Sequence, residues 1–107
     1  MKLQQTDLFG GKGIVDILSL LKGNEEPFSA VLHCELAAGG SVGKHRQQRD
    51  PELVIGVSGE GTITVDGIVH PLVEKSAVYV PFGSVLSIQN LSAVQSLQYW
   101  IIKAQLS

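Results

Sequence analysis

The sequence predicts an all-β protein built from short antiparallel strands in a sandwich or barrel. Twelve glycines divide its 107 residues into short segments rich in β-branched residues, and short strands between regular turns are typical of both architectures. Asp66-Gly67 is the strongest hairpin signal, because both residues tolerate the positive φ angles of a type I′ turn. Residues 28–37 alternate between two faces, as expected for a strand whose faces meet different surroundings.

The first predicted strand, Ile14–Leu21, has apolar residues that also fit a helical stripe, but eight residues between glycines are too few for a helix. Phe28–Ala37 follows the turn at residues 23–27. Glu52–Ser58 is a continuous apolar strand, and the tight turn at residues 59–61 leads out of it. Including the strands that follow, we expect about nine or ten strands and no helix. The later segments are Thr62–Val65, Ile68–Val73, Ala77–Val80, Val85–Leu91 and Val94–Ala104.

The chain length and composition predict one domain over residues 1–107. The sequence is 44% hydrophobic but only 17% charged, so the core is ample and the polar surface is thin. A monomer of this size buries roughly 60–65% of its unfolded surface. Because few charges cover the remainder, we expect some apolar surface to meet a second subunit in a homodimer.

The charge pattern limits the partners. The formal net charge of −2 argues against nucleic-acid binding, which needs a basic stripe. Lys44, Arg46 and Arg49 form a local positive excess, which is either a solvated strand end or a rim that steers an anionic ligand.

Cys34, the only cysteine, lies in an apolar run, which predicts a buried, inert thiol and no disulfide. With no signal-peptide pattern and no apolar run near the roughly 18 residues of a membrane span, we expect a cytoplasmic protein that binds no membrane.

The first motif lies between residues 39 and 59. Its anchors are separated by five, one, four and six intervening residues: Gly39, His45, Gln47, Glu52 and Gly59. Because one residue separates His45 from Gln47, both side chains point to the same face of a strand. Glu52 returns on what we expect to be the adjoining strand, where it can meet them.

A second motif covers residues 75–90. Its anchors are separated by five, one, two and three intervening residues: Lys75, Pro81, Gly83, Leu86 and Asn90. With the hairpin at residues 59–67, the two motifs resemble those of the cupins, and the resemblance runs from about Gly39 to Ile102. It implies a double-stranded β-helix of the jelly-roll group, the cupin barrel. Glycine normally opens the second motif, so Lys75 implies a turn that is built differently.

The resemblance also implies a divalent metal inside the barrel, held by three histidines and one glutamate. His45 and Glu52 match two of these positions, whereas Gln47 and Leu86 replace the other two histidines. Imidazole, amide oxygen and carboxylate form a weaker set than two histidines and a carboxylate, and Leu86 supplies no donor. Iron, zinc, nickel or manganese would therefore bind weakly, or not at all, through His45, Gln47 and Glu52.

The other histidines and the aromatic residues are weaker candidates for the functional site. His33 is expected on the outer or dimer face of its strand, and His70 in a structural or exposed position. Tyr79, Tyr99 and Trp100 are expected to pack in the core or at an interface. Since Tyr99 and Trp100 are adjacent, they face opposite sides and only one of them can line a pocket.

Three functions stay open. The favoured one is a binding module that holds a small organic molecule, anionic if the basic rim steers it, through His45, Gln47, Glu52 and Leu86, with weak or absent metal. The alternative is an enzyme: a metal-dependent dioxygenase, isomerase or decarboxylase using His45, Gln47 and Glu52, or a metal-free catalyst with His45 as base tuned by Glu52. A structural dimer or sensing module is the third. The fold alone selects no reaction.

Overall fold

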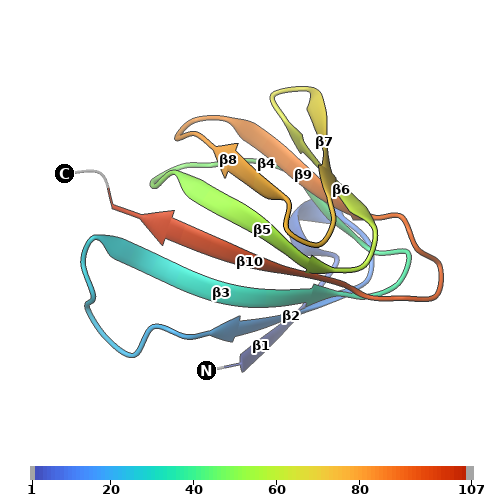
Figure 1. Cartoon of the computed structure of the whole chain (residues 1–107), viewed down its shortest axis with the longest axis horizontal. Coiled ribbons are helices and arrows are strands. Elements are labelled where there is room, and N and C mark those ends of the chain that lie inside the picture. The colour runs from blue at the N-terminus through green and yellow to red at the C-terminus, as the bar shows by residue number, and fades with distance from the viewer. Residues whose placement is uncertain (1, 106–107) are drawn as a thin grey trace.

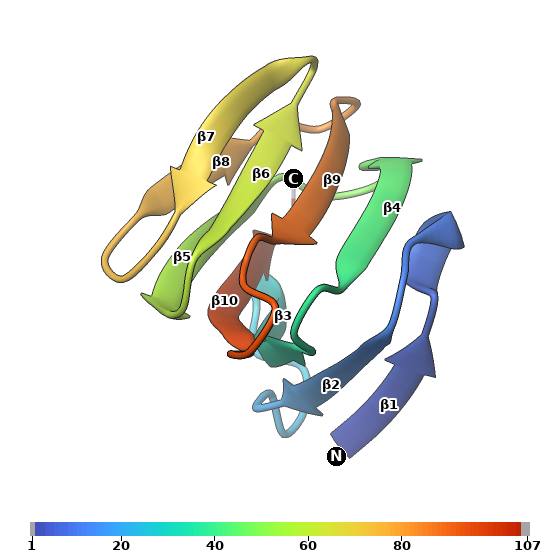
Figure 2. The ribbon, with the colours of Figure 1, turned by 90° about the vertical axis from the view of Figure 1, so that its right-hand side faces the viewer.

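The computed structural model describes residues 2–105 and arranges them as two facing β-sheets (Figures 1 and 2). The larger sheet has six strands in the order β1-β2-β3-β10-β5-β8, and the smaller has four in the order β4-β9-β6-β7. Neighbouring strands are antiparallel throughout. The prediction of an all-β jelly-roll barrel is confirmed.

The strands are short and follow one another closely along the chain. In chain order they are β1 (Lys2–Thr6), β2 (Ile14–Ser19), β3 (Phe28–Leu36), β4 (Ser41–Arg46), β5 (Glu52–Ser58), β6 (Gly61–Val65), β7 (Ile68–Leu72), β8 (Ala77–Val80), β9 (Val85–Asn90) and β10 (Leu97–Ala104). A single 3-10 turn, η1 (Leu8–Gly10), joins β1 to β2.

Each of the eight strands listed from the sequence exists, with small differences at the ends. The largest difference is in β10, which begins at Leu97 rather than Val94. Val94 instead lies in a loop, with 87% of its surface exposed. Neither β1 nor η1 was predicted, because every residue of β1 is exposed and its short sequence carries no alternation of apolar and polar residues.

The core lies between the sheets and is built from alternate residues of their strands. On β10, for example, Leu97 and Tyr99 are buried, while Gln98 and Trp100 on the opposite face are half-buried. Period-two burial of this kind follows from the pleat of a strand. Buried apolar residues from both sheets form one cluster: Val15, Cys34, Leu36, Val42, Val54, Ile63, Val65, Leu72, Val78, Val80, Leu86, Ile88, Leu97 and Tyr99.

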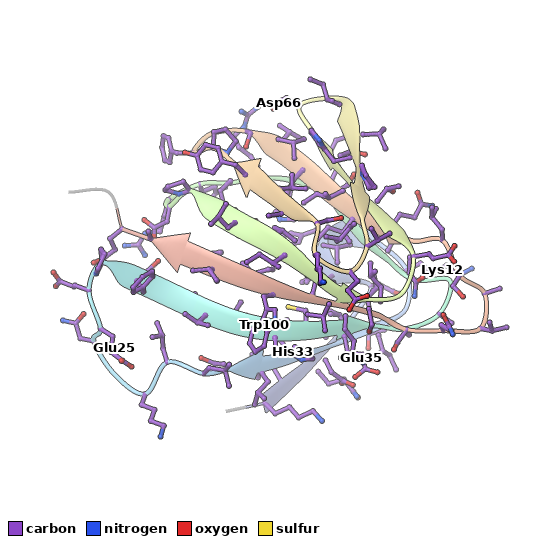
Figure 3. All side chains as sticks on the ribbon, viewed as in Figure 1. Lys12, Glu25, His33, Glu35, Asp66 and Trp100 are labelled. Atoms are coloured by element: carbon purple, nitrogen blue, oxygen red, sulfur yellow. The ribbon has the colours of Figure 1, made fainter. Side chains whose placement is uncertain are left out.

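Two turns depend on left-handed backbone. Asp66 and Gly67 have φ angles of 48° and 82°, as the type I′ prediction requires, and Asp66 lies at the tip of the β6–β7 hairpin (Figure 3). Lys75 also has a positive φ, 69°. The lysine therefore adopts the left-handed conformation that favours glycine, and the expectation that its turn is built differently stays a prediction.

The chain crosses between the sheets after β4. Strand β4 belongs to the four-stranded sheet, whereas β5 belongs to the six-stranded sheet. Residues 47–51 make the connection, so the first motif spans both walls of the barrel. Within residues 2–105, no helix is long and apolar enough to cross a membrane.

Candidate functional site

A cavity of about 890 Å³ opens between the two sheets. Four side chains predicted from the motifs line it together: His45, Gln47, Glu52 and Leu86. His45 and Leu86 come from the four-stranded sheet, where they form a direct cross-strand pair between β4 and β9. The four positions that the cupin resemblance assigned to one site therefore line one cavity.

Apolar surface makes up the larger part of the cavity wall, which also carries polar and charged side chains. Both sheets and the turn η1 contribute apolar side chains to it: Leu8, Val15, Ile17, Leu32, Val42, Ile88 and Ile101. Leu86 adds to this surface and is 2% exposed. Apolar walls with a few convergent polar groups are the usual construction of a small-molecule site.

His45 is held by its own strand and by η1. Its Nδ1 lies 2.8 Å from the carbonyl oxygen of Gly43, and because a carbonyl only accepts, Nδ1 must carry the proton and leave Nε2 as an acceptor. The ring stacks on Phe9 with the centroids 3.8 Å apart and an interplanar angle of 14°. Burial lowers the pKa of His45, as does the charge of Lys103, and the bond to Gly43 opposes the shift only in part.

The contact between η1 and β4 relies on glycine. A Cβ on Gly43 would collide with the carbonyl oxygen of Phe9, so the backbones approach more closely than any side chain there would permit. Phe9 itself has a φ of 53°, a conformation that is uncommon outside glycine. This arrangement places the exposed Phe9 ring against His45.

Gln47 follows the last residue of β4 and is 5% exposed. Its Nε2 donates to the carbonyl of Asp50 over 2.5 Å. Its backbone nitrogen donates to the Ser84 carbonyl, and its own carbonyl accepts from the Gly83 nitrogen, both over 2.8 Å. Gln47 thus ties the first motif to the turn of the second motif, in addition to lining the cavity.

Glu52 does not return on a strand that adjoins β4, as the sequence suggested, but on β5 in the opposite sheet. The reason is the crossing at residues 47–51, which the motif spacing does not reveal. Glu52 is 4% exposed, and its Oε2 lies 3.9 Å from Nζ of Lys103. Burial raises the pKa of Glu52, and the positive charge of Lys103 offsets only part of this increase.

The sequence analysis missed several polar groups of the cavity wall, among them Cys34, Tyr99 and Lys103. Cys34 and Tyr99 are cross-strand neighbours on β3 and β10, and their side chains are hydrogen-bonded. Burial raises the pKa of Cys34 to about 12, which agrees with the expected buried thiol. The alternation of β10 could have indicated Lys103, because it shares a strand face with Tyr99 and Ile101.

Tyr99 and Trp100 face opposite sides of β10, as expected. Tyr99 lines the cavity and is 1% exposed, whereas Trp100 lies on the other face of β10 beside His33, with ring centroids 4.9 Å apart (Figure 3). Neither His33 nor His70 lines the cavity. Of the basic cluster, Arg46 and Arg49 line it and Lys44 does not.

The side chains present do not fit the metal centre that the motif implies. In the described part of the chain, no three His, Cys, Asp or Glu residues are placed so that they could hold one ion. Leu86 has no donor atom, and an amide oxygen at Gln47 is a neutral, poor ligand for iron, zinc or nickel. The remaining imidazole and carboxylate make an incomplete set.

The family model of the cupin domain matches residues 32–102, from β3 to β10. The chain belongs to the cupin family. No protein of curated function matches it. Among solved cupin-like structures, the crystal structure of a predicted oxalate decarboxylase from Thermotoga maritima superposes with a TM-score of 0.88 at 24% identity, covering 99% of this chain and 93% of that one.

Two further structures show the breadth of the fold. The cupin domain of Schizosaccharomyces pombe Cnp3 has a TM-score of 0.78 at 19% identity, over 97% of this chain and 69% of that one. KdgF from Halomonas sp. has a TM-score of 0.69 at 14% identity, over 87% and 81%. At these identities the similarity establishes the cupin barrel and not the activity.

Proposed function

We propose that this cupin binds a small organic anion in its barrel without a resident metal ion. The observation that carries the proposal is the apolar cavity in which Leu86 occupies the position of a metal-binding histidine. Its volume of about 890 Å³ lies within the roughly 300–1,000 Å³ of typical ligand pockets. Leu86 extends the aliphatic wall where a metal-binding cupin would present an imidazole.

The charges around the cavity favour an anion. Arg46, Arg49 and Lys103 line it, against the carboxyl groups of Asp50 and Glu52. Asp50 already accepts a hydrogen bond of 2.6 Å from the Ser29 hydroxyl, and the Glu52 carboxyl group already faces Lys103 over 3.9 Å, so both acidic side chains have partners within the protein. A carboxylate beside Arg49 or Lys103, with an apolar tail against the aliphatic wall, satisfies both parts of the site.

The polar side chains inside the cavity would orient the bound ligand. Nε2 of His45 accepts a hydrogen bond from a ligand hydroxyl, given the tautomer that Gly43 imposes. Glu52, facing the same cavity, accepts a second one when it is ionised. The ligand class is therefore a small carboxylic acid with an apolar portion and room for a hydroxyl group.

The alternative is a metal-dependent or acid–base cupin enzyme that uses His45, Gln47 and Glu52. Its support is that these three residues line one cavity and that divalent metals are common in the family. For the acid–base branch, the lowered pKa of His45 leaves the ring neutral and its Nε2 able to accept a proton near pH 7. The incomplete donor set makes metal-free binding the better-supported function.

Octanoate is a suitable probe for the proposal, with octanol as its uncharged analogue. We expect octanoate to shift amide NMR signals of cavity residues and to bind more tightly than octanol. Ala30→Trp places an indole in the cavity, because Ala30 lines it, and should weaken octanoate binding at least about tenfold. Ser87→Trp makes a similar change of size on a strand residue that does not line the cavity and should leave binding unchanged.

Two results separate the alternatives. If neither probe shifts cavity signals, or if Ala30→Trp and Ser87→Trp behave alike, the cavity is not the binding site. Elemental mass spectrometry on tag-free protein purified without chelator tests the metal. One equivalent of iron, zinc, nickel or manganese per chain would favour the enzyme, and far less than one agrees with a metal-free pocket.

A further inference from the structure

Lys103 differs in its surroundings from every other lysine within residues 2–105. It lines the cavity, and no other lysine of this part of the chain does. Its side chain is 34% exposed, whereas the remaining lysines are exposed on the surface: Lys2, Lys12, Lys22, Lys44 and Lys75. An apolar, partly closed site is the usual environment of a lysine that acts as a nucleophile. Lys103 is therefore the amine that a ligand inside the barrel would meet.

The register of the six-stranded sheet places a carboxyl group beside this amine. Lys103 on β10 pairs with Glu52 on β5, and these two strands lie side by side (Figure 1). Nζ of Lys103 lies 3.9 Å from Oε2 of Glu52, whose side chain is 3% exposed. The carboxyl group is thus fixed in the cavity wall, and the longer, more exposed lysine can reach from it to a ligand.

Glu52 is placed to act as the base that a nucleophilic lysine requires. Only the neutral amine attacks a carbonyl carbon, so a nearby group must first take a proton from the ammonium form. Burial raises the pKa of Glu52, which makes its carboxylate a stronger base than an exposed one and its acid form a proton donor near neutral pH. The other carboxyl group of the cavity wall, that of Asp50, instead accepts a hydrogen bond of 2.6 Å from Ser29.

We propose that Lys103 forms an imine with a ligand that carries a ketone or aldehyde group, and that Glu52 transfers the protons. Glu52 takes one proton from the Lys103 ammonium group. Nζ then attacks the carbonyl carbon and forms the C–N bond, and a proton passes from the nitrogen to the carbonyl oxygen, which becomes a hydroxyl group.

Loss of water completes the step. Glu52 returns its proton to the hydroxyl group, the C–O bond breaks, and the electron pair of the nitrogen forms the C=N bond. The products are one water molecule and a protonated imine beside the Glu52 carboxylate. The ion pair of Lys103 and Glu52 is thereby replaced by an ion pair of the same charges, and no oxidant or reductant is consumed.

The rest of the ligand follows from the proposed function, on which this inference rests. That function supplies a carboxylate and an apolar tail. Arg49 lines the same cavity and can pair with the carboxylate, which leaves Lys103 for the carbonyl carbon. An oxo acid with an aliphatic chain has all three groups: a carboxylate for the arginine, a ketone for the lysine and a tail for the apolar wall.

Reductive trapping with 2-oxooctanoate and sodium cyanoborohydride tests the imine. The reagent reduces an imine to a stable secondary amine, which peptide mass spectrometry assigns to one lysine. We expect the adduct at Lys103 and at least about tenfold less at Lys44, which is exposed and outside the cavity, because the ligand is held beside Lys103 alone. Octanoate has the same chain without the ketone, so it should form no adduct and should slow the trapping of 2-oxooctanoate.

Three variants assign the roles. Lys103→Arg keeps the positive charge but removes the nucleophile, and it should abolish the adduct. Lys44→Arg is the matched control and should leave the yield unchanged. Glu52→Gln removes the base with little change in size, and it should slow trapping at least about a hundredfold while its circular dichroism spectrum stays that of the wild type. The distribution of the adduct over the wild-type lysines decides the question if Lys103→Arg folds poorly.

The outcomes separate this inference from the proposed function. An adduct spread evenly over the lysines overturns the imine, as does a wild-type yield in folded Lys103→Arg. If octanoate shifts NMR signals of cavity residues but 2-oxooctanoate leaves Lys103 unmodified, the imine is wrong and the anion site stands. If neither acid shifts these signals and Lys103 stays unmodified, both are wrong.

Discussion

Glu52 and Lys103 face each other across β5 and β10, with the carboxylate and ammonium groups 3.9 Å apart inside the cavity. The two groups differ in their exposure: the Glu52 side chain is 3% exposed and that of Lys103 is 34% exposed. Lys103 can therefore turn toward solvent or a ligand, while Glu52 cannot leave the wall. The net effect on Glu52 is a raised pKa, because burial outweighs the attraction of the ammonium group.

This relationship predicts a specific pH dependence of stability. A carboxyl group whose folded-state pKa lies above its unfolded value of 4.5 stabilises the fold in its neutral form, and this contribution is lost as the pH rises through the folded-state pKa. Glu52→Gln stays neutral, so its melting temperature relative to wild type should rise from pH 4 to pH 8. Glu60→Gln, at an exposed position, is the control and should show no such trend. A pH-independent difference for Glu52→Gln would contradict the raised pKa.

The stack of Phe9 on His45 predicts a measurable shift in titration. Burial lowers the pKa of His45 from its usual 6.5, and the Phe9 ring covers one face of the imidazole. Phe9→Ala should admit water, stabilise the charged ring and move the pKa of His45 upward. NMR titration of the histidine signals measures this directly, with Phe82→Ala as a control because Phe82 is similarly exposed, at 55%, and is absent from the cavity wall. If both variants titrate like the wild type, the stack does not control His45.

The site could be predicted from sequence to the extent that it depends on local periodicity. Strand spacing predicted that His45 and Gln47 share a face, and the resemblance to the cupins added Leu86 to the same site; each lies on or beside a strand whose pleat fixes its direction. The spacing could not reveal that Glu52 lies on the opposite sheet, because that depends on how residues 47–51 cross the barrel. Lys103 is farther in sequence and reaches Glu52 only through the register of β10 with β5.

Two other features lay beyond local reasoning, each for its own physical reason. Strand β1 is fully exposed, so burial leaves no imprint on its sequence. The position of η1 depends on close packing of backbone against Gly43, and a glycine by itself does not tell which segment approaches it. The continuous apolar character of Glu52–Ser58, by contrast, was visible from the start and corresponds to a strand with apolar residues on both faces.

Asn90 should be critical for stability rather than for ligand binding. It is 3% exposed, and its Nδ2 lies within 3.2 Å of the carbonyl oxygens of Leu36, Ala37 and Gln95. Its Oδ1 accepts from the backbone of Ser92 over 2.9 Å. Asn90→Ala leaves several buried carbonyls without this donor and should lower the free energy of unfolding by about 3 kcal/mol. Urea denaturation measures the loss. Gln89→Ala at the exposed neighbouring position is the control and should change the free energy of unfolding by less than about 0.5 kcal/mol. Equal losses for Asn90→Ala and Gln89→Ala would rule out a stabilising role of Asn90.

The replaced histidine positions predict that metal binding can be restored. His45 and Leu86 are a direct cross-strand pair, so their Cβ atoms lie roughly 5 Å apart, and Leu86→His would set a second imidazole beside the first. Adding Gln47→His completes three imidazoles and the Glu52 carboxylate around one cavity. We expect the double variant to bind zinc or nickel at least about 100-fold more tightly than the wild type, because it regains the borderline donors these ions prefer. Isothermal titration calorimetry measures the gain.

The control for this prediction moves one histidine to a neighbouring position in the cavity. Ile88 also lines the cavity, but it pairs with Val42 rather than with His45. Gln47→His with Ile88→His therefore adds the same two side chains without rebuilding the motif geometry, and it should bind metal no better than Gln47→His alone. Equal affinity for the two double variants would mean that imidazole content, and not the position of Leu86, determines metal binding. A specific gain would show that the barrel retains the geometry of a cupin metal centre and that the side chains at Gln47 and Leu86 keep the ion out.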